Sequence, residues 1–190
     1  MKKVRYKKGL QPSVNQFTWF RTGLFGTGNI EAVVMFTENT IYETKDPKNQ
    51  DDWNKLFGCS WGFDPLVKQF QMHENSSRWV WRWNKNRGVF QVAPYVYING
   101  KVSYPELSGF PIIDLQVNEK ILLGISPSKE FSKTYFNYTK DILGEDYGPL
   151  QVLCQVNQPV PSLAGFVAPG FFGGDETAPS DLFYYFKRVV

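Results

Sequence analysis

The sequence has a single histidine, His73, and only two cysteines, Cys59 and Cys154, among its 190 residues. So few nitrogen and sulfur ligands, with no CxxC motif, give little from which to build a metal site. Because the sequence shows no export signal, we expect two free, buried thiols rather than a disulfide. The scarcity of these side chains therefore predicts neither a metal centre nor a cofactor.

Long apolar runs are also missing. No stretch approaches the roughly 20 apolar residues of a membrane-spanning helix. No apolar segment of signal-peptide length follows the basic start at residues 1–8. We therefore expect no membrane partner and a protein that stays in the compartment where it is made.

Charged residues make up 21% of the sequence, against 42% hydrophobic and 17% aromatic residues. This composition excludes a disordered chain and suits one folded domain with a sizeable core. Residues 1–8 and 75–105 carry five positive charges each, and the remainder is net acidic. We interpret residues 1–12 as a basic arm, either a solvated terminus or a segment that contacts nucleic acid or an acidic neighbour.

No catalytic constellation is apparent in the sequence. The adjacent acids Asp51-Asp52 and Glu145-Asp146 face apart on a strand and do not converge in a helix. No motif places a nucleophile or an acid partner against His73, so a structural or loop histidine is the simpler interpretation. The sequence accordingly predicts a protein that is not an enzyme.

The strongest positive signal is the stretch from Asn75 to Trp83, which holds three of the six tryptophans. Read as a strand, its side chains alternate between two faces. One face carries Ser77, Trp79, Trp81 and Trp83. The other face carries Arg78, Val80 and Arg82.

Three arrangements of this strand are consistent with the pattern. The tryptophans can fill a sandwich core, where each ring buries on the order of 150–250 Å². Alternatively, one or more of them is exposed as a platform for sugar rings or unstacked bases, with Arg78 and Arg82 pairing with acids elsewhere. In the inverse arrangement, the arginines face a ligand.

The tryptophan strand is followed by clear turn signals. A polar turn at residues 84–88 leads into a return strand over residues 89–98. Pro94 donates no ladder hydrogen bond, which indicates a sheet edge or a bulge. Asn99-Gly100 then predicts a two-residue hairpin into residues 101–104, so three consecutive antiparallel strands are expected.

Most other predicted elements are strands as well. We expect them at residues 17–20, 30–36, 112–117, 120–125, 134–138, 150–156 and 182–190, with 112–117 and 120–125 paired as a hairpin. The exceptions are a short helix at residues 53–57, where Trp53, Leu56 and Phe57 would form one apolar face, and a helical turn starting at Asp64-Pro65.

Short strands with regular turn signals predict an all-β fold, an antiparallel β-sandwich of jelly-roll type with one or two short helices. An OB-like barrel is the second choice. We divide the chain into the basic arm (1–12), the sandwich domain (13–158), and a Gly/Pro-rich extension with a final strand (159–190). Phe171 and Phe172 in this extension are candidate anchors for a neighbouring subunit.

Three segments carry a resemblance to known proteins: Trp53-Asn54-Lys55-Leu56-Phe57-Gly58, His73 to Trp83, and Tyr95-Val96-Tyr97-Ile98-Asn99-Gly100. The combination resembles small β-sandwich proteins of Bacteroidetes and their phages, including crAss-like phages. Their pattern has an Asn-Lys-Leu-Phe-Gly element, a His-rich turn, an Asn-Ser-Ala-Arg strand and a Tyr-x-Tyr-x-Asn-Gly hairpin. This chain has one histidine in the turn and Ser77 in place of alanine.

The resemblance covers residues 53–100 and implies a virion or cell-surface accessory component. We therefore expect a non-enzymatic virion structural protein of a tailed phage (a capsid accessory, connector or tail component), made in the host cytoplasm. Its expected partners are other virion proteins or copies of itself, and nucleic acid only through the basic arm. The alternative is a carbohydrate-binding module with glycan on an exposed tryptophan face. Candidate contact residues are Trp79, Trp81, Trp83, Arg78, Arg82, Phe171 and Phe172.

Overall fold

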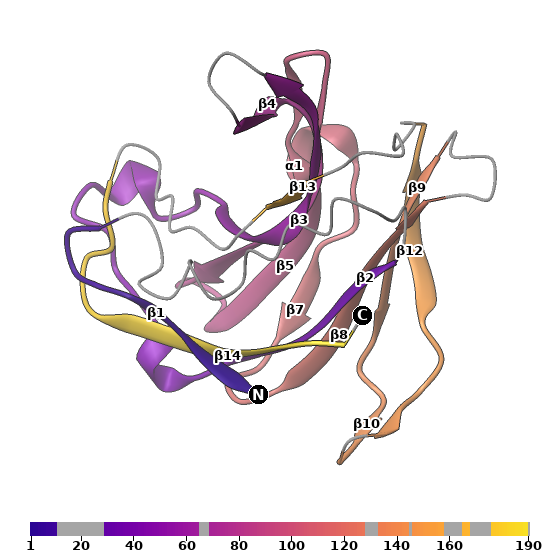
Figure 1. The fold of residues 1–190 in the computed structure, drawn as a ribbon. Helices are drawn as coiled ribbons and strands as arrows, with labels where there is room; N and C mark the ends of the chain where they lie inside the picture. The colour runs from indigo at the N-terminus through magenta and orange to yellow at the C-terminus, as the bar shows by residue number, and fades with distance from the viewer. Residues whose placement is uncertain are drawn as a thin grey trace.

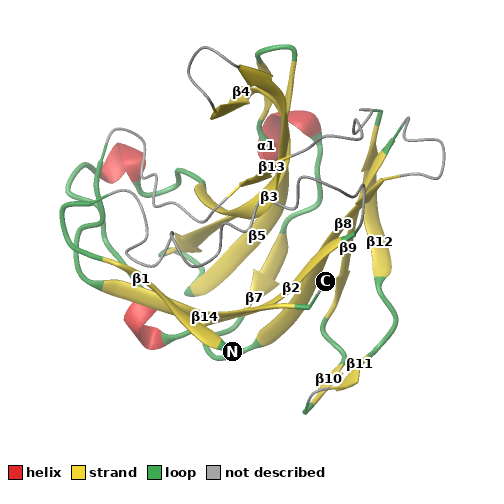
Figure 2. Cartoon of the chain, viewed as in Figure 1, coloured by secondary structure: helices red, strands yellow, loops and turns green. Residues whose placement is uncertain are grey.

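A computed structural model describes residues 1–10, 29–64, 69–127, 133–144, 146–157, 165–167 and 176–189. Two six-stranded antiparallel sheets pack face to face around one hydrophobic core (Figure 1). Within these residues, helix occurs as short pieces in the connections (Figure 2). The predicted all-β antiparallel sandwich is confirmed.

The first sheet has the strand order β1 (Lys2–Tyr6), β14 (Leu182–Arg188), β2 (Ile30–Phe36), β8 (Lys120–Pro127), β9 (Thr134–Thr139), β12 (Gln151–Val156). The second sheet has the order β13 (Gly165–Val167), β3 (Asn54–Asp64), β4 (Gln69–Asn84), β5 (Val89–Ile98), β6 (Lys101–Ser103), and β7 (Ile113–Leu115) also pairs with β5. The remaining elements are a hairpin of β10 (Ile142–Leu143) and β11 (Asp146–Tyr147), the helix α1 (Pro105–Ser108), and the 3-10 turns η2 (Glu38–Thr40) and η3 (Pro47–Asn49).

A Greek key places the fourth of four successive strands beside the first, and a jelly roll contains two such keys. In the second sheet β13 lies beside β3, but the strands β6 to β12 intervene in the chain between β5 and β13. The observed order therefore does not establish a Greek key. The jelly-roll type stays a prediction. None of the helices in the described ranges is long and apolar enough to cross a membrane.

The predicted three-stranded meander is confirmed as β4, β5 and β6. Asn99 and Gly100 have φ angles of 49° and 75°, the positive values that a two-residue hairpin turn of type I′ requires. The outer side of β5 pairs with β7 over residues 90–92 and with β6 over residues 96–98. Pro94, which has no N–H to donate, lies in the gap between these two short partners.

The predicted helix at residues 53–57 is wrong, because this segment begins β3. The pairing of β3 with β4 shifts register between Lys55 and Phe57, which indicates a β-bulge. A bulge adds one residue to a strand, and both Leu56 and Phe57 are in the core here. Two consecutive inward-facing apolar residues thus imitate the spacing of a helical face.

The predicted hairpin over residues 112–125 is also wrong. Its two strands belong to different sheets, because β7 pairs with β5 whereas β8 pairs with β2 and β9. Residues 116–119 between them form a turn that crosses from one sheet to the other. Asn118 has a φ of 66°, and its backbone N–H donates to the carbonyl oxygen of Phe36 at 2.7 Å.

Both ends of the described chain belong to the first sheet. Residues 2–6 form β1, which pairs with β14, and β14 lies between β1 and β2 in the first sheet. Val4 and Tyr6 are both 1% exposed. Charged residues alternate with Val4 and Tyr6, which is the pattern of an amphipathic strand. The many positive charges made this segment read as a solvated arm in the sequence. The predicted strand at 17–20 and the anchors Phe171 and Phe172 lie outside the described residues.

The core is organised around Trp81, which is completely buried. Its ring lies 5.0–6.5 Å from five other aromatic rings, measured between centroids; these belong to Tyr6, Phe36, Tyr42, Phe90 and Tyr184. The five come from β1, β2, the segment after η2, β5 and β14. The cluster therefore joins both sheets and both ends of the described chain.

Deleting residues 1–6 should destabilise the isolated protein. Burying one large apolar side chain contributes about 1.5–3 kcal/mol, and the deletion removes both Val4 and Tyr6 from the core. We expect the free energy of unfolding, measured by urea denaturation, to fall by at least about 3 kcal/mol. The exposed substitution Arg5→Ser is the matched control and should leave the midpoint in place. An unchanged midpoint after the deletion would mean that β1 adds nothing to the core.

Candidate functional site

The tryptophan face of β4 points into the sandwich. Trp79 and Trp81 are 0% exposed and Trp83 is 8% exposed. The indole N–H of Trp79 crosses the core and donates to the carbonyl oxygen of Gly124 on β8 at 3.0 Å. The first arrangement, a tryptophan core, is therefore the one observed, and the prediction of an exposed tryptophan platform is wrong for these three residues.

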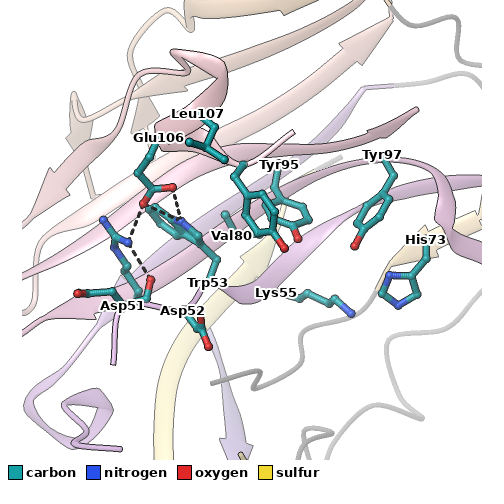
Figure 3. A pocket seen from close by; sticks show the side chains of 12 residues that line it. Asp51, Asp52, Trp53, Lys55, His73, Val80, Tyr95, Tyr97, Glu106 and Leu107 are labelled. Atoms are coloured by element: carbon teal, nitrogen blue, oxygen red, sulfur yellow. Dashed lines mark hydrogen bonds and ion pairs between the residues drawn. The ribbon is translucent and has the colours of Figure 1, made fainter. Parts of the chain in front are cut away.

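The opposite face of β4 lines a groove of about 450 Å³ on the outside of the second sheet (Figure 3). Its walls come from the segment before β3, from β3, β4 and β5, and from the start of α1. We call it the outer-face groove, and its main lining residues are Trp53, Lys55, Arg82, Tyr95, Tyr97 and Glu106. Of the predicted contact residues, Arg82 lines the groove directly and Arg78 lies beneath its tyrosines.

One end of the groove is fixed by a network of charged and polar contacts. Arg82 Nη1 lies 2.7 Å from Glu106 Oε1, and the Trp53 indole N–H donates to the same carboxylate at 3.0 and 3.1 Å. The guanidinium of Arg82 lies over the Trp53 ring, 4.2 Å from its centroid. Arg82 also donates to the side chain of Gln91 and to the backbone oxygen of Asp51, both at 2.8 Å. These contacts hold Trp53 in one orientation.

The other end is built from tyrosines and cations. Arg78 is completely buried, and its guanidinium carbon lies 5.2 Å and 5.1 Å from the ring centroids of Tyr95 and Tyr97. The His73 ring meets Tyr97 edge-on at 5.2 Å. In Figure 3, Lys55 and His73 lie on the Tyr97 side. Cation–π contact compensates part of the cost of burying the Arg78 charge.

Burial and repulsion between positive charges lower the pKa values of the basic groups at this end of the groove. Burial, followed by the positive charge of Arg78, lowers the pKa of Lys55 to about 8. Burial likewise lowers the pKa of Arg78 to about 10, against the opposing effect of Tyr95 and Tyr97. The pKa of His73 is lowered by desolvation and then by Lys55 and Arg78. At neutral pH this end therefore carries the positive charges of Lys55 and Arg78 beside a neutral imidazole.

The acids gather at the end that holds Trp53. Asp51 and Asp52 precede β3, and Glu106 is in the first turn of α1. Figure 3 shows these three carboxylates around Trp53, away from Tyr97. The groove is therefore divided into an acidic end and a basic end, with aromatic rings between them.

Part of the groove could be predicted from the sequence. Alternation places Tyr95 and Tyr97 on one face of β5, and the register then sets Arg78 opposite Tyr95. Lys55 and Trp53 could not be placed in the same way, because the segment that holds them was predicted to be helical. Arg82 and Glu106 are 24 positions apart in sequence and meet only through the fold.

A second feature is the edge strand β12, which ends the first sheet. Within the described ranges no strand pairs with its outer edge. Its six residues, Gln-Val-Leu-Cys-Gln-Val, include no charge and no proline, and Val152 is 63% exposed. At the opposite edge, β1 carries Lys2, Lys3 and Arg5.

The cysteines are free, as predicted. Cys59 is buried, and burial raises the pKa of its thiol to about 12; Cys154 is partly buried, and burial raises its thiol pKa to about 11. High thiol pKa values disfavour the reactive thiolate at neutral pH. Among the described residues, no group of three or more His, Cys, Asp or Glu side chains is placed to hold a metal ion.

No protein-family model matches this chain, and no curated protein matches it either.

Gly58 controls how closely β3 approaches β4 beneath the groove. A Cβ atom at this position would collide with the Ser77 carbonyl oxygen and would lie 2.6 Å from Arg78 Cα. Gly58→Ala should therefore lower the free energy of unfolding by about 1–3 kcal/mol, the usual cost of overpacking. Gly124→Ala in β8 is the matched control, because its Cβ would meet atoms no closer than 3.4 Å. Equal urea midpoints for the two variants would contradict the close approach at Gly58.

Proposed function

We propose that this chain is a non-enzymatic structural component of a tailed-phage virion, a capsid accessory, connector or tail component that acts through protein–protein contacts. The resemblance over residues 53–100 supplies the setting. The observation that carries the protein-contact role is the edge strand β12, which offers its outer edge to a neighbouring chain.

An edge strand exposes a row of backbone N–H and C=O groups that can pair with another strand. Proteins usually block such pairing with charged side chains, proline or a bulge. β12 has a register irregularity between Val152 and Cys154, but it has neither charges nor proline. Its exposed Val152 adds apolar surface along this edge, with which none of the described strands pairs.

The opposite edge of the same sheet, formed by β1, differs from β12 in its charge. Three of the five residues of β1 are Lys or Arg, and positive charge at an edge repels a second copy of the same strand. One edge of the first sheet is thus protected by charge, whereas the other is suited to strand addition. The partner in this proposal is another virion protein or a second copy of this chain.

A second candidate function is carbohydrate binding, and the outer-face groove is the observation that favours it. The groove combines aromatic rings with fixed polar groups, as ligand sites generally do. It lies on the face of β4 opposite to the tryptophans, so a glycan bound there would contact Trp53 and the tyrosines rather than Trp79, Trp81 or Trp83.

Replacing Val152 and Gln155 with lysine should block strand addition. Both side chains are exposed, so the fold should persist, while two positive charges on the edge disfavour pairing. Quantitative mass spectrometry of purified particles would measure the copies of this chain per particle. We expect a stoichiometric number for the natural chain and a loss of about tenfold or more for the variant, equivalent to 1.4 kcal/mol of contact energy.

The matched control replaces Asn86 and Ser108 with lysine. Both are exposed, in the β4–β5 turn and on α1, and neither lines the outer-face groove, so this variant adds the same charge at the other sheet. Its copy number should equal that of the natural chain. Absence of the natural chain from purified particles would overturn the virion role. Full incorporation of the β12 variant would leave the virion role standing but exclude this edge as the contact.

A further inference from the structure

We propose that the outer-face groove binds an acidic sugar, a pyranose ring that carries one carboxylate. The ring lies against Trp53 and Tyr95, its carboxylate pairs with Lys55, and its hydroxyl groups face the acidic end. This inference rests on the second candidate function, carbohydrate binding, and names the class of sugar. The volume of the groove, about 450 Å³, lies within the range of small-molecule sites.

The aromatic rings suit the apolar face of a sugar. Trp53 is held by Arg82 and Glu106, so little side-chain freedom is lost when a ring packs on it. Tyr95 is fixed between Tyr97 and Tyr104, with ring centroids 5.8 Å and 5.7 Å away. A preorganised aromatic surface with polar tips matches a ligand that has C–H groups on its faces and hydroxyls around its edge.

The basic end accounts for the carboxylate. Lys55 lines the groove and is 9% exposed, and the buried cation Arg78 lies below Tyr95 and Tyr97. Because burial and Arg78 lower the pKa of Lys55 to about 8, an anion placed beside this ammonium would raise it again. A carboxylate in the groove therefore gains from two positive charges in a setting partly screened from water.

The acidic end accounts for the hydroxyl groups and excludes a polyanion. Carboxylates accept hydrogen bonds from sugar hydroxyls, and a carboxylate has about four acceptor sites. Glu106 accepts from Trp53 and Arg82, which leaves it capacity for a hydroxyl donor. Single-stranded nucleic acid requires a positive groove along its backbone, whereas Asp51, Asp52 and Glu106 place negative charge at one end of this groove.

Sugar binding should depend on pH, because Lys55 loses its positive charge when it is deprotonated. The carboxylate pairs with the protonated ammonium, so binding is strongest below the Lys55 pKa of about 8 and weakens as the pH rises above it. We expect about tenfold weaker binding at pH 9.5 than at pH 7. An arginine side chain has a much higher pKa than a lysine side chain, so Lys55→Arg should make the pH dependence much smaller.

The test is isothermal titration calorimetry of the full chain with three acidic probes: methyl β-glucuronide, methyl β-galacturonide and methyl α-sialoside. The neutral probes are the methyl esters of these three acids, together with methyl β-glucoside. At least one acidic probe should bind, and its neutral counterparts should bind about 10- to 100-fold more weakly, the value of one charge-assisted hydrogen bond. Lys55→Met should cause a similar loss.

The matched control is Lys120→Met, which removes an exposed lysine of β8 outside the groove and should bind like the natural protein. Thermal melting of each variant shows that it is folded. Equal affinity for acidic and neutral sugars overturns the acidic-sugar inference but leaves carbohydrate binding standing. If no sugar binds, both the acidic-sugar inference and carbohydrate binding are overturned. Tight binding of a single-stranded oligonucleotide that Lys55→Met abolishes would also overturn both. The lysine variant of β12 should retain sugar binding, which separates these outcomes from the virion proposal.

Discussion

Strand β4 serves the core and the outer surface at once, because successive side chains of a strand point to opposite faces. Its inward residues include Trp81, the aromatic ring that contacts elements from both sheets and from both ends of the described chain. Its outward residues include Arg78 and Arg82, which support the two ends of the groove. A slip of one residue in the pairing of β4 would exchange the two sets. The register of β4 therefore determines both the core and the site.

The strands beside β4 adapt to this register. On one side, Gly58 lets the β3 backbone approach Arg78, and a bulge near Lys55 turns two apolar residues inward while the lysine reaches the groove. On the other side, β5 supplies Tyr95 and Tyr97 above the buried guanidinium. Among the described residues, none from the first sheet lines this groove, and no strand pairs with the outer edge of β12 in that sheet. The fold thus separates a surface suited to a small ligand from an edge suited to another chain.

The sequence predicts the elements whose pattern is local. Runs rich in β-branched and aromatic residues mark β2 and β5, and Asn-Gly places the turn after β5. Prediction from the sequence fails where tertiary contacts override the local pattern. At β3, a bulge imitates the spacing of a helix. At β1, the burial of Val4 and Tyr6 depends on the pairing of this strand with β14. The groove combines both cases. Its tyrosines follow from alternation, whereas the meeting of Arg82 with Glu106 depends on the placement of α1.

Hydroxyl-radical footprinting read by mass spectrometry tests the two-faced role of β4 most directly, because it reports the exposure of individual aromatic side chains. In the folded protein, Tyr104, which is 44% exposed, should be oxidised rapidly and the partly exposed Trp53 more slowly, whereas Trp79 and Trp81 should be protected. An acidic sugar should then protect Trp53 and Tyr95, which line the groove, and leave the rates of the core residues Trp79 and Trp81 unchanged. Oxidation of Trp79 or Trp81 at the rate of Tyr104 would contradict the account, because it would place the tryptophan face of β4 outside the core.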